Sequence, residues 1–464
     1  MTECSQTELE FQGLFSREVI GRFDGGQITS DGGSLLLREV ERRTGILRRF
    51  ADCFSDHRAV DRIEHRVEEL IAQRIYALAL GYEDLNDHEQ LRADPLLAML
   101  AGKRDPEGKD RKQERDRGKA LAGKSTLNRW ELTRADATEQ ERYAKIVMDP
   151  AAIDQLLVEV FLEAHTTAPA EMVLDLDATD DPLYGKQEGR FFHGYYGHYC
   201  YLPLYIFAGD HLLCARLRPS HTDASAGSRE EVERIVQQIR ARWPEVRILL
   251  RADSGFCRDD LMSWCEANQI HYVFGLARNQ RLRKSIDAEM AQARALHEQT
   301  QQAVRVFTEF VYETHDSWSR ARRVVAKAEH LSKGENPRFV VTSLDAAYLP
   351  AQPLYEQLYC GRGEMENRIK EQFSLFSDRT STAYLRSNQL RLYLSSIAYL
   401  LLEAFRRLGL NGTAMARAQC QTIRLKLLKV GALVRVTVRK VWVSFSSGYP
   451  DQVLFARVFQ QLHC

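Results

Sequence analysis

The residues with the clearest chemical potential in this sequence are acidic positions far apart along the chain. Asp175 and Asp177 lie in LDLDAT, an alternating segment that predicts a strand, so both point to the same face. Asp253 follows the apolar run VRILLRA, and Glu366 lies in YCGRGEMENRIKEQF. A buried strand tolerates a carboxylate poorly unless something binds it. Two aspartates and a glutamate therefore predict an oxygen-rich site for Mg²⁺ or Mn²⁺.

The segment around Glu366 adds groups that suit a phosphate. If it is helical, one face within an arc of roughly 80° carries a phenol, a guanidinium, a carboxylate and an ammonium. These groups belong to Tyr359, Arg362, Glu366 and Lys370. Gly361 and Gly363 leave open whether the helix already includes Arg362. Two metal ions about 3.5–4 Å apart activate a water or a 3′-hydroxyl against a phosphodiester, and an arginine fork binds phosphate oxygens.

Each of these acids also has a simpler explanation when it is taken alone. A pair of aspartates on a strand can be an edge or capping feature, and Asp253 can cap the helix that follows it. Glu366 can belong to a solvated helix face together with Arg362, Arg368 and Lys370. Only the conjunction of all three acids, in this order along the chain, favours catalysis.

The elements that must position these residues show two types of pattern. The first 165 residues have mainly helical spacing, interrupted by a charged stretch at 102–125 that predicts an exposed loop. From Glu171 the patterns follow the order β-β-β-α-β-α-β, which predicts a mixed sheet with helices on its faces. Residues 303–344 predict three further strands, and 352–408 a long helical region. The expected fold class is a multi-domain α/β protein.

Composition limits the class of protein. The chain has 464 residues, 44% of them hydrophobic, and equal numbers of basic and acidic residues, 64 each, which is typical of a globular protein with several domains. It has no apolar run long enough to span a membrane and does not begin like a secretion signal. Its nine cysteines include no CxxC pair, which favours reduced thiols and a cytoplasmic protein.

The acids and their neighbours also resemble a known family. Asp177-Ala-Thr179, the RADSGF segment around Asp253 and the spacing Tyr359-x2-Arg362-x3-Glu366 resemble the DDE transposases of bacterial insertion sequences, in the branch marked by a Tyr-Arg-Glu-Lys signature. The resemblance implies a ribonuclease-H-like catalytic core with a β-rich insertion between the second aspartate and the glutamate. It implies two Mg²⁺ (or Mn²⁺) ions held by Asp177, Asp253 and Glu366. Tyr359 and Arg362 fall on positions that contact DNA phosphates in this family.

Three positions depart from the family pattern or leave an alternative open. The signature lysine of the family falls on Phe373, so Lys370, on the same predicted face, is the substitute we expect to contact DNA. Asp175 is the rival of Asp177 for the first ligand position. Trp318 is the only tryptophan of residues 281–345, and relatives use a tryptophan of the insertion to hold a flipped base. We favour its alternative, an exposed turn residue or the anchor of a small core.

The end of the chain is strongly basic. No acidic residue lies between Glu403 and Asp451, and residues 404–450 contain nine cations. They are Arg406, Arg407, Arg417, Arg424, Lys426, Lys429, Arg435, Arg439 and Lys440. Because solvated faces usually mix charges of both signs, we expect contacts with DNA phosphates here, with Arg435 and Arg439 on one face of a strand. The stretch 102–125, with nine cations and five acids, is a weaker signal of the same kind.

These inferences predict a division of the chain and a function. Residues 1–165 would form a helical DNA-binding region, 166–280 and 346–403 the catalytic domain, 281–345 a β insertion, and 404–464 a basic C-terminal region. The resemblance implies a transposase that cleaves double-stranded DNA at terminal inverted repeats, transfers the strands to target DNA, and acts as a homodimer. We expect it in the bacterial cytoplasm at the nucleoid. The alternatives are another ribonuclease-H-like nuclease, or a non-catalytic DNA-binding protein derived from a transposase.

Overall fold

The structure, a computed structural model, describes residues 8–463, so Cys4 and Cys464 of the cysteine prediction lie outside it. The chain divides into two compact units. One unit contains Met1–Val147 and Ile397–Cys464, and the other contains Met148–Ser396. The first unit is therefore built from both ends of the chain, and the predicted basic C-terminal region belongs to the same unit as the N-terminal helices.

The second unit is organised by a mixed sheet that has nine strands among the described residues. In sheet order the path is β11 (His211–Arg216), β10 (Leu204–Ala208), β6 (Glu171–Ala178), β12 (Arg247–Ala252), β13 (His271–Leu276), β17 (Arg338–Thr342), β15 (Arg322–Leu331) and β14 (Val304–Tyr312). The short β16 (Gly334–Glu335) pairs with β15 outside this path. β6, β12 and β13 run parallel, and the other pairs are antiparallel. The predicted mixed sheet is confirmed.

Alternation along β6 separates the core from the face that carries the acids. Met172, Leu174 and Leu176 are buried in the main hydrophobic cluster of this unit. Because successive side chains of a strand point to opposite faces, Asp175 and Asp177 share the other face, as the spacing predicted. α7 (Pro150–Glu163) packs against β11 and against α8 (Ser228–Arg242), so this helix belongs with the sheet although its spacing resembled the N-terminal helices.

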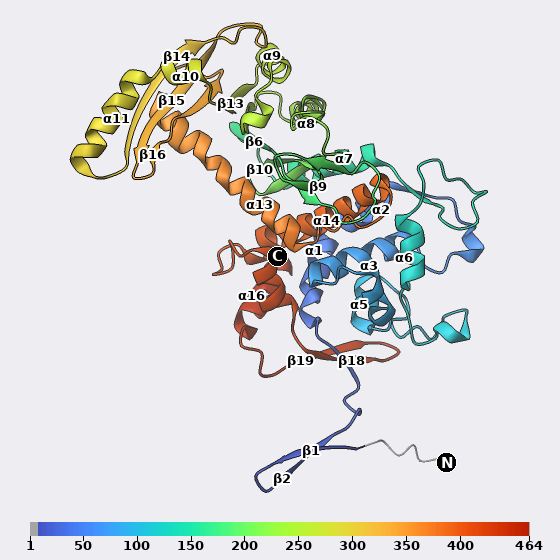
Figure 1. Cartoon of the computed structure of the whole chain (residues 1–464). Helices are drawn as coiled ribbons and strands as arrows, with labels where there is room; N and C mark the ends of the chain where they lie inside the picture. Colours follow the sequence, from blue (N-terminus) through green and yellow to red (C-terminus); the bar gives the residue numbers. More distant parts are fainter. Residues whose placement is uncertain (1–7, 464) are drawn as a thin grey trace, which may run out of the picture. The chain divides into compact units, whose positions relative to one another are not determined.

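The three strands predicted within residues 303–344 are β14, β15 and β17. They continue the main sheet, because β17 pairs with β13, whereas the sequence suggested an insertion apart from the sheet. Residues 281–345 also include most of α10 (Gln280–Lys284) and all of α11 (Asp287–Thr300). α11 lies along β14 and β15 (Figure 1) and buries only Met290 and Ala293, which explains why its weak apolar pattern was missed.

The first unit is mainly helical around a buried central helix. Its helices include α1 (Leu35–Thr44), α2 (Ile46–Ala51), α3 (Val67–Leu80), α5 (Pro95–Leu100), α6 (Lys124–Glu131) and α16 (Gln452–His463). α3 is buried at every position from Glu69 to Leu80, as expected of a helix that is apolar on nearly all sides. The unit also contains strands that the helical prediction did not include: β1 (Leu9–Leu14), β2 (Arg17–Gly21) and β3 (Gln27–Thr29).

A small sheet joins the two ends of the chain. β3 pairs with β18 (Ala432–Val436), which pairs in turn with β19 (Val441–Phe445). Gly32 lies beside this sheet, where its N–H donates to the carbonyl of Val430 at 2.8 Å. A Cβ at Gly32 would lie 2.8 Å from that oxygen, so the glycine-rich segment permits a close backbone approach.

The charged stretch 102–125 is only partly the exposed loop that was predicted. Up to α6 it holds no helix longer than a single turn, but Ala120, Leu121 and Ala122 are buried. Arg111 folds into it and donates from Nη1 to the carbonyls of Lys119 at 3.0 Å and Leu121 at 3.2 Å. Backbone carbonyls therefore bind one of the cations that suggested an exposed basic loop.

Within residues 8–463, no helix is both long and apolar enough to cross a membrane. The cysteines in this range are all unbridged.

Candidate active site

Asp175, the rival for the first ligand position, is already bound by the protein. It lies beside Arg251 in the parallel register of β6 and β12, and the guanidinium binds it from Nε to Oδ1 at 2.5 Å and from Nη2 to Oδ2 at 2.8 Å. Asp175 is 4% exposed, and burial raises the pKa of its carboxyl, a rise that Arg251 opposes. This bidentate pair occupies both carboxylate oxygens, which favours Asp177 over Asp175 as the residue open to a ligand.

The same arginine attaches the next helical segment to the sheet. Arg251 Nη1 donates to the carbonyl of Leu358 at 2.6 Å. A Cβ at Gly361 would lie 2.5 Å from that Nη1, so a larger residue here would displace the guanidinium. Asp175 and Arg251 are therefore positioning residues, and the sequence analysis assigned no function in the site to Arg251 or Gly361.

Asp177 lies two residues further along the same face of β6. The N–H of Ala178 donates to its Oδ1 at 2.9 Å, and Arg362 Nη1 donates to its Oδ2 at 3.3 Å. Burial raises the pKa of Asp177 to about 6. Arg362 opposes that rise, while the nearby charges of Asp253 and Glu366 add to it. Three carboxylates thus act on one another in this place, and their charge is only partly neutralised.

Asp253 follows β12 directly. Ala252 pairs with Leu176, so Asp253 and Asp177 occupy matching positions at the ends of two adjacent parallel strands. Asp253 caps the turn Ser254–Phe256, because its Oδ1 accepts the N–H of Gly255 at 2.8 Å. The capping role considered from the sequence is therefore real, and it involves one carboxylate oxygen.

An irregular helical segment precedes Glu366 in the chain. A short helix, Ala351–Pro353, is followed by a π-helical segment, Leu354–Tyr359, a 3₁₀ turn, Cys360–Arg362, and α13 (Gly363–Ser374). The question that the two glycines left open is answered, because the chain is helical through Arg362. Arg362 Nη2 donates to Glu366 Oε1 at 3.4 Å, so one guanidinium bridges Glu366 and Asp177. Single π-helical turns are frequent at functional sites.

Tyr359 lies beside Asp253 because residue 275 is a glycine and leaves room for the phenol. A Cβ at Gly275, in β13, would lie 2.6 Å from the Tyr359 hydroxyl and 2.9 Å from the backbone nitrogen of Ser254. The phenol therefore fits against the sheet only because residue 275 is glycine. Burial raises the pKa of Tyr359, which keeps its hydroxyl protonated at neutral pH. The isolated glycine in the strand HYVFGLA was a signal of close approach that the sequence reading did not use.

The residues fit a divalent cation in their chemistry. Three carboxylates are the hard oxygen donors that Mg²⁺ and Mn²⁺ prefer, and the charges of Asp253 and Glu366, which add to the rise that burial causes in the pKa of Asp177, favour added positive charge here. Among residues 8–463, however, no group of three acidic, histidine or cysteine side chains stands close enough together to hold a metal ion. In the structure Arg362, between Asp177 and Glu366, supplies the positive charge.

Comparison with known proteins identifies the family. The chain matches the sequence model of the family described as Transposase DDE domain group 1 over residues 11–464. This chain belongs to the DDE transposase family. Among solved structures it is similar to a chain from the cryo-EM structure of a piggyBac transposase synaptic complex with hairpin DNA, with 12% identity, 86% of this chain and 80% of that chain covered, and a TM-score of 0.39. A search of curated proteins finds no match.

Family membership confirms the resemblance at the level of the DDE transposase domain and indicates an enzyme of the nuclease and transposase class. DDE transposases generally use divalent metal ions, in agreement with the oxygen-donor chemistry of this site. The bacterial insertion sequence, the signature branch and the roles of individual residues stay predictions.

Two other residues of this DDE transposase that were predicted to contact DNA lie in different surroundings. Lys370 is exposed on α13, one turn after Glu366, while Phe373 is half-buried. Trp318 is 8% exposed and belongs to the main core cluster, with its ring edge-on to Tyr312 at 5.8 Å between centroids. This place in the core agrees with the core anchor that we favoured for Trp318, and its contact with a flipped base stays a prediction.

The basic tail is not one continuous surface. Arg424 is 9% exposed and donates to the carbonyls of Ala79 at 2.8 Å and Leu78 at 3.2 Å, at the end of α3. Burial lowers its pKa. Lys429 pairs with Asp31 at 2.7 Å. The guanidinium of Arg424 therefore holds the end of α3, and Lys429 is largely occupied within the protein, so their contacts with DNA stay predictions.

Much of the exposed charge of the tail lies on the β18–β19 hairpin and at Lys426, and Arg417 is exposed as well. Lys426, Arg435, Arg439 and Lys440 are exposed. Arg439 lies in the turn between the strands, so it does not share a strand face with Arg435 as predicted. Arg435 and Lys440 lie 6.0 and 5.3 Å from the ring centroid of Trp442, itself 49% exposed. The hairpin thus presents cations around an aromatic ring, a combination that suits a nucleic acid.

Proposed function

We propose that this DDE transposase catalyses metal-dependent cleavage at the terminal inverted repeats of a bacterial insertion sequence and transfers the strands to target DNA. The observation that carries the proposal is the single guanidinium of Arg362 bridging Asp177 and Glu366 beside Asp253. Residues from two adjacent strands and a distant helix meet at this point. The order β11-β10-β6-β12-β13, with β6 parallel to β12 and antiparallel to β10, supports a ribonuclease-H-like core.

In this proposal Asp177, Asp253 and Glu366 hold two Mg²⁺ or Mn²⁺ ions. When bound, such ions lower the pKa of an attacking water or hydroxyl and stabilise the charge of the leaving oxygen. The carboxylates belong to the ends of two adjacent strands and to α13, and Arg251 binds the helical segment that precedes α13 to the sheet.

The reaction has two phosphoryl-transfer steps. First, the oxygen of water bonds to a phosphodiester phosphorus while the bond from phosphorus to the 3′ oxygen breaks; one proton passes to the 3′-hydroxyl and the other to solvent, leaving a 5′-phosphate. Then the freed 3′-hydroxyl bonds to a target phosphorus and loses its proton, and a target 3′ oxygen leaves as a hydroxyl.

Three residues bind the phosphates in this proposal. Arg362 binds a non-bridging phosphate oxygen, the Tyr359 hydroxyl donates to another, and Lys370 contacts the flanking phosphate.

We also propose the partners. Double-stranded DNA, as inverted repeats and as target, contacts the exposed cations Lys426, Arg435, Arg439 and Lys440. Two copies of the chain act together as a homodimer in the bacterial cytoplasm, at the nucleoid.

The test compares two single-alanine variants of the full chain. Asp253→Ala is expected to bind inverted-repeat DNA like the wild type but to produce no nicks in Mg²⁺, whereas Glu298→Ala, an exposed acid on α11, is expected to cut normally. Nicking by Asp253→Ala at the wild-type rate would contradict the assignment. Wild-type cleavage without strand transfer would favour another ribonuclease-H-like nuclease. Binding without cleavage in Mg²⁺ or Mn²⁺ would favour a non-catalytic DNA-binding protein.

A further inference from the structure

The first unit contains a cavity of about 920 Å³ lined by segments between Arg58 and Ile146. Nine of the lining side chains are lysine or arginine, and three are aspartate or glutamate. The volume falls in the range of about 300–1,000 Å³ that small-molecule ligand sites occupy. Such an excess of positive charge in a concave wall attracts anions.

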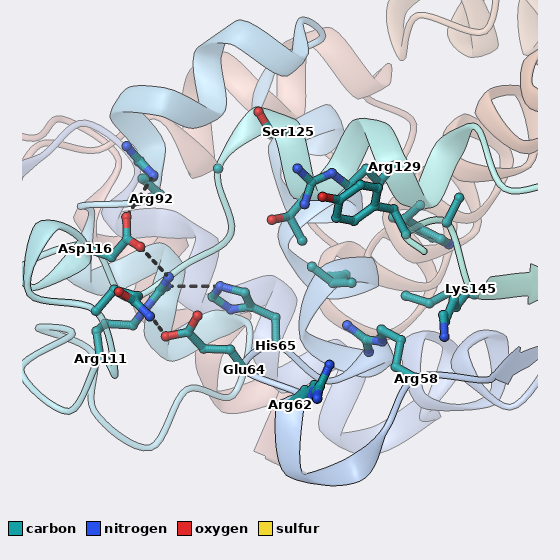
Figure 2. Close-up of a pocket in the computed structure, with 18 of the residues that line it drawn as sticks. Arg58, Arg62, Glu64, His65, Arg92, Arg111, Asp116, Ser125, Arg129 and Lys145 are labelled. Carbon is teal, nitrogen blue, oxygen red and sulfur yellow. Dashed lines mark hydrogen bonds and ion pairs between the residues drawn. The ribbon is translucent and has the colours of Figure 1, made fainter. Parts of the chain in front are cut away.

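One side of the cavity is neutralised by the protein itself. Arg111 pairs with Glu64 at 2.8 Å and donates from Nη1 to His65 Nε2 at 3.0 Å, and Asp116 lies 3.7 Å from Arg92 (Figure 2). Burial, followed by the neighbouring cations, lowers the pKa of His65 to about 2. His65 is therefore neutral, and the charged groups on this side are paired with one another within the protein.

The other side carries cations that the protein does not neutralise. Arg62, Arg129 and Arg142 are exposed, and no carboxylate among residues 8–463 forms an ion pair with them. Figure 2 shows Arg62 and Arg129 away from the dashed contacts of the Arg111 network. Lys145 also lines the cavity, and its ammonium donates to the carbonyl of Glu139 and not to a carboxylate. Positive charge without a protein partner thus faces the cavity from several segments.

An aromatic ring lies among these cations. Tyr143 is 52% exposed, and the guanidinium carbons of Arg129 and Arg142 lie 4.5 and 5.0 Å from its ring centroid. Ser125 and Thr126, in the first turn of α6, add hydroxyl donors to the wall. Cations bind phosphate oxygens, and an exposed ring offers a face on which a base stacks.

We propose that this cavity binds a DNA strand at an unstacked nucleotide, with phosphodiester oxygens on Arg62, Arg129 and Arg142 and the base on Tyr143. The inference rests on the proposed function in taking DNA as the substrate. Several unpaired cations favour several linked phosphates over one free anion. A base reaches Tyr143 only if it has left the stack of the duplex, so unpaired DNA is the favoured form.

The test measures binding of labelled DNA to the full chain by fluorescence anisotropy, without divalent ions. One probe is a blunt duplex and the other is the same duplex with a single-stranded extension. Arg129→Ala/Arg142→Ala is expected to reduce the slope of log affinity against log salt by about 1.4 to 1.8, because each lost phosphate contact removes about 0.7–0.9. The matched control is Arg38→Ala/Arg42→Ala, two exposed arginines of α1 that do not line the cavity.

Variants of Tyr143 test the contact with the base separately from the contacts with the phosphates. Tyr143→Ala is expected to weaken binding of the extended probe about 10-fold and to leave the blunt duplex unchanged, whereas Tyr143→Phe restores the affinity. Equal unfolding midpoints of all variants would show that the fold is intact. Unchanged salt slopes and affinities would overturn the proposal. So would protection of the cavity by a nucleoside triphosphate alone, which would make a free phosphate compound the occupant.

This outcome is independent of the cleavage test. Binding is measured without metal ions and with the acids of the catalytic site intact. A loss of binding in the cavity variants therefore stands even if Asp253→Ala cuts DNA, and normal binding by the cavity variants does not affect the catalytic proposal.

Discussion

The acidic site, at the edge of the sheet where β6 and β12 end, and the basic cavity of the first unit both contain arginines and carboxylates. Carboxylates outnumber arginines in the site, whereas arginines and lysines outnumber carboxylates in the cavity. At the sheet edge, Arg362 is shared by Asp177 and Glu366 next to a third acid, so the place attracts positive charge. In the cavity, nine cations face three acids, and Arg62 and Arg142 have no carboxylate partner among residues 8–463. The first arrangement suits a metal ion, and the second suits phosphate groups.

The comparison also separates two uses of arginine. Arg251 and Arg111 have short contacts with a carboxylate and with backbone carbonyls, and they fix segments of the chain. Within residues 8–463, the side chains of Arg129 and Arg142 have neither kind of contact, and both lie near the ring of Tyr143. A paired, buried arginine is therefore expected to affect stability when its partner is removed, and an exposed, unpaired one is expected to affect binding.

The largest effect is expected where a fixed pair is broken. Asp175→Ala leaves the buried Arg251 without its carboxylate, and removing one partner of a buried ion pair costs about 3–5 kcal/mol. Asp177→Ala removes a contact of 3.3 Å to an arginine that keeps Glu366, so its cost is expected to be about 1 kcal/mol or less. Urea denaturation of both variants measures the difference in the free energy of unfolding.

The result separates the two aspartates of one strand face. Equal destabilisation by both substitutions would contradict the division into a structural Asp175 and a functional Asp177. A stable Asp175→Ala variant that has lost cleavage would restore Asp175 as the first ligand.

The sequence predicted the elements better than it predicted the partners of charged side chains. Alternation in LDLDAT was sufficient to place Asp175 and Asp177 on one face, because that depends only on neighbouring residues. The pairing of Asp175 with Arg251 joins residues 76 positions apart, and the contact of Arg424 with Ala79 joins residues 345 apart. No local pattern shows which residues pair over such distances. The basic run 404–450 therefore predicted an exposed surface, although Arg424 within it is buried.

Two glycines were a further signal of the site's geometry that the sequence prediction did not use. Gly275 and Gly361 stand in a strand and in a helical segment, where glycine is unfavourable, and each admits a side chain of the site. The signal was present in the sequence, but the identity of the admitted group, Tyr359 or Arg251, follows only from the fold.

An intermediate effect is expected at Arg362, which is paired but at longer distances. If it binds the phosphate during cleavage, Arg362→Ala removes a preorganised donor, and such losses reduce catalysis by about 10²–10³-fold. Arg362→Lys is expected to restore little, because an ammonium lacks the planar fork. Single-turnover nicking at saturating DNA measures this. Arg129→Ala/Arg142→Ala should cut normally at saturation, and an equal loss in that variant would contradict the separation of the two regions.

The smallest effect is expected in the basic tail, where Arg424 is buried and Lys426, two residues later, is exposed. Arg424→Ala removes two hydrogen bonds from a charged donor to the end of α3, and it is expected to lower the free energy of unfolding by about 1–3 kcal/mol. Lys426→Ala, at an exposed position, is expected to leave stability unchanged and to reduce the salt slope of DNA binding by about 0.9. Thermal unfolding and salt titration of both variants check this. Burial decides the outcome, because a guanidinium buried inside the unit and held by carbonyls is not accessible to a phosphate, whereas Lys426 is exposed to solvent. A changed salt slope for Arg424→Ala at full stability would show that its guanidinium leaves α3 to reach DNA.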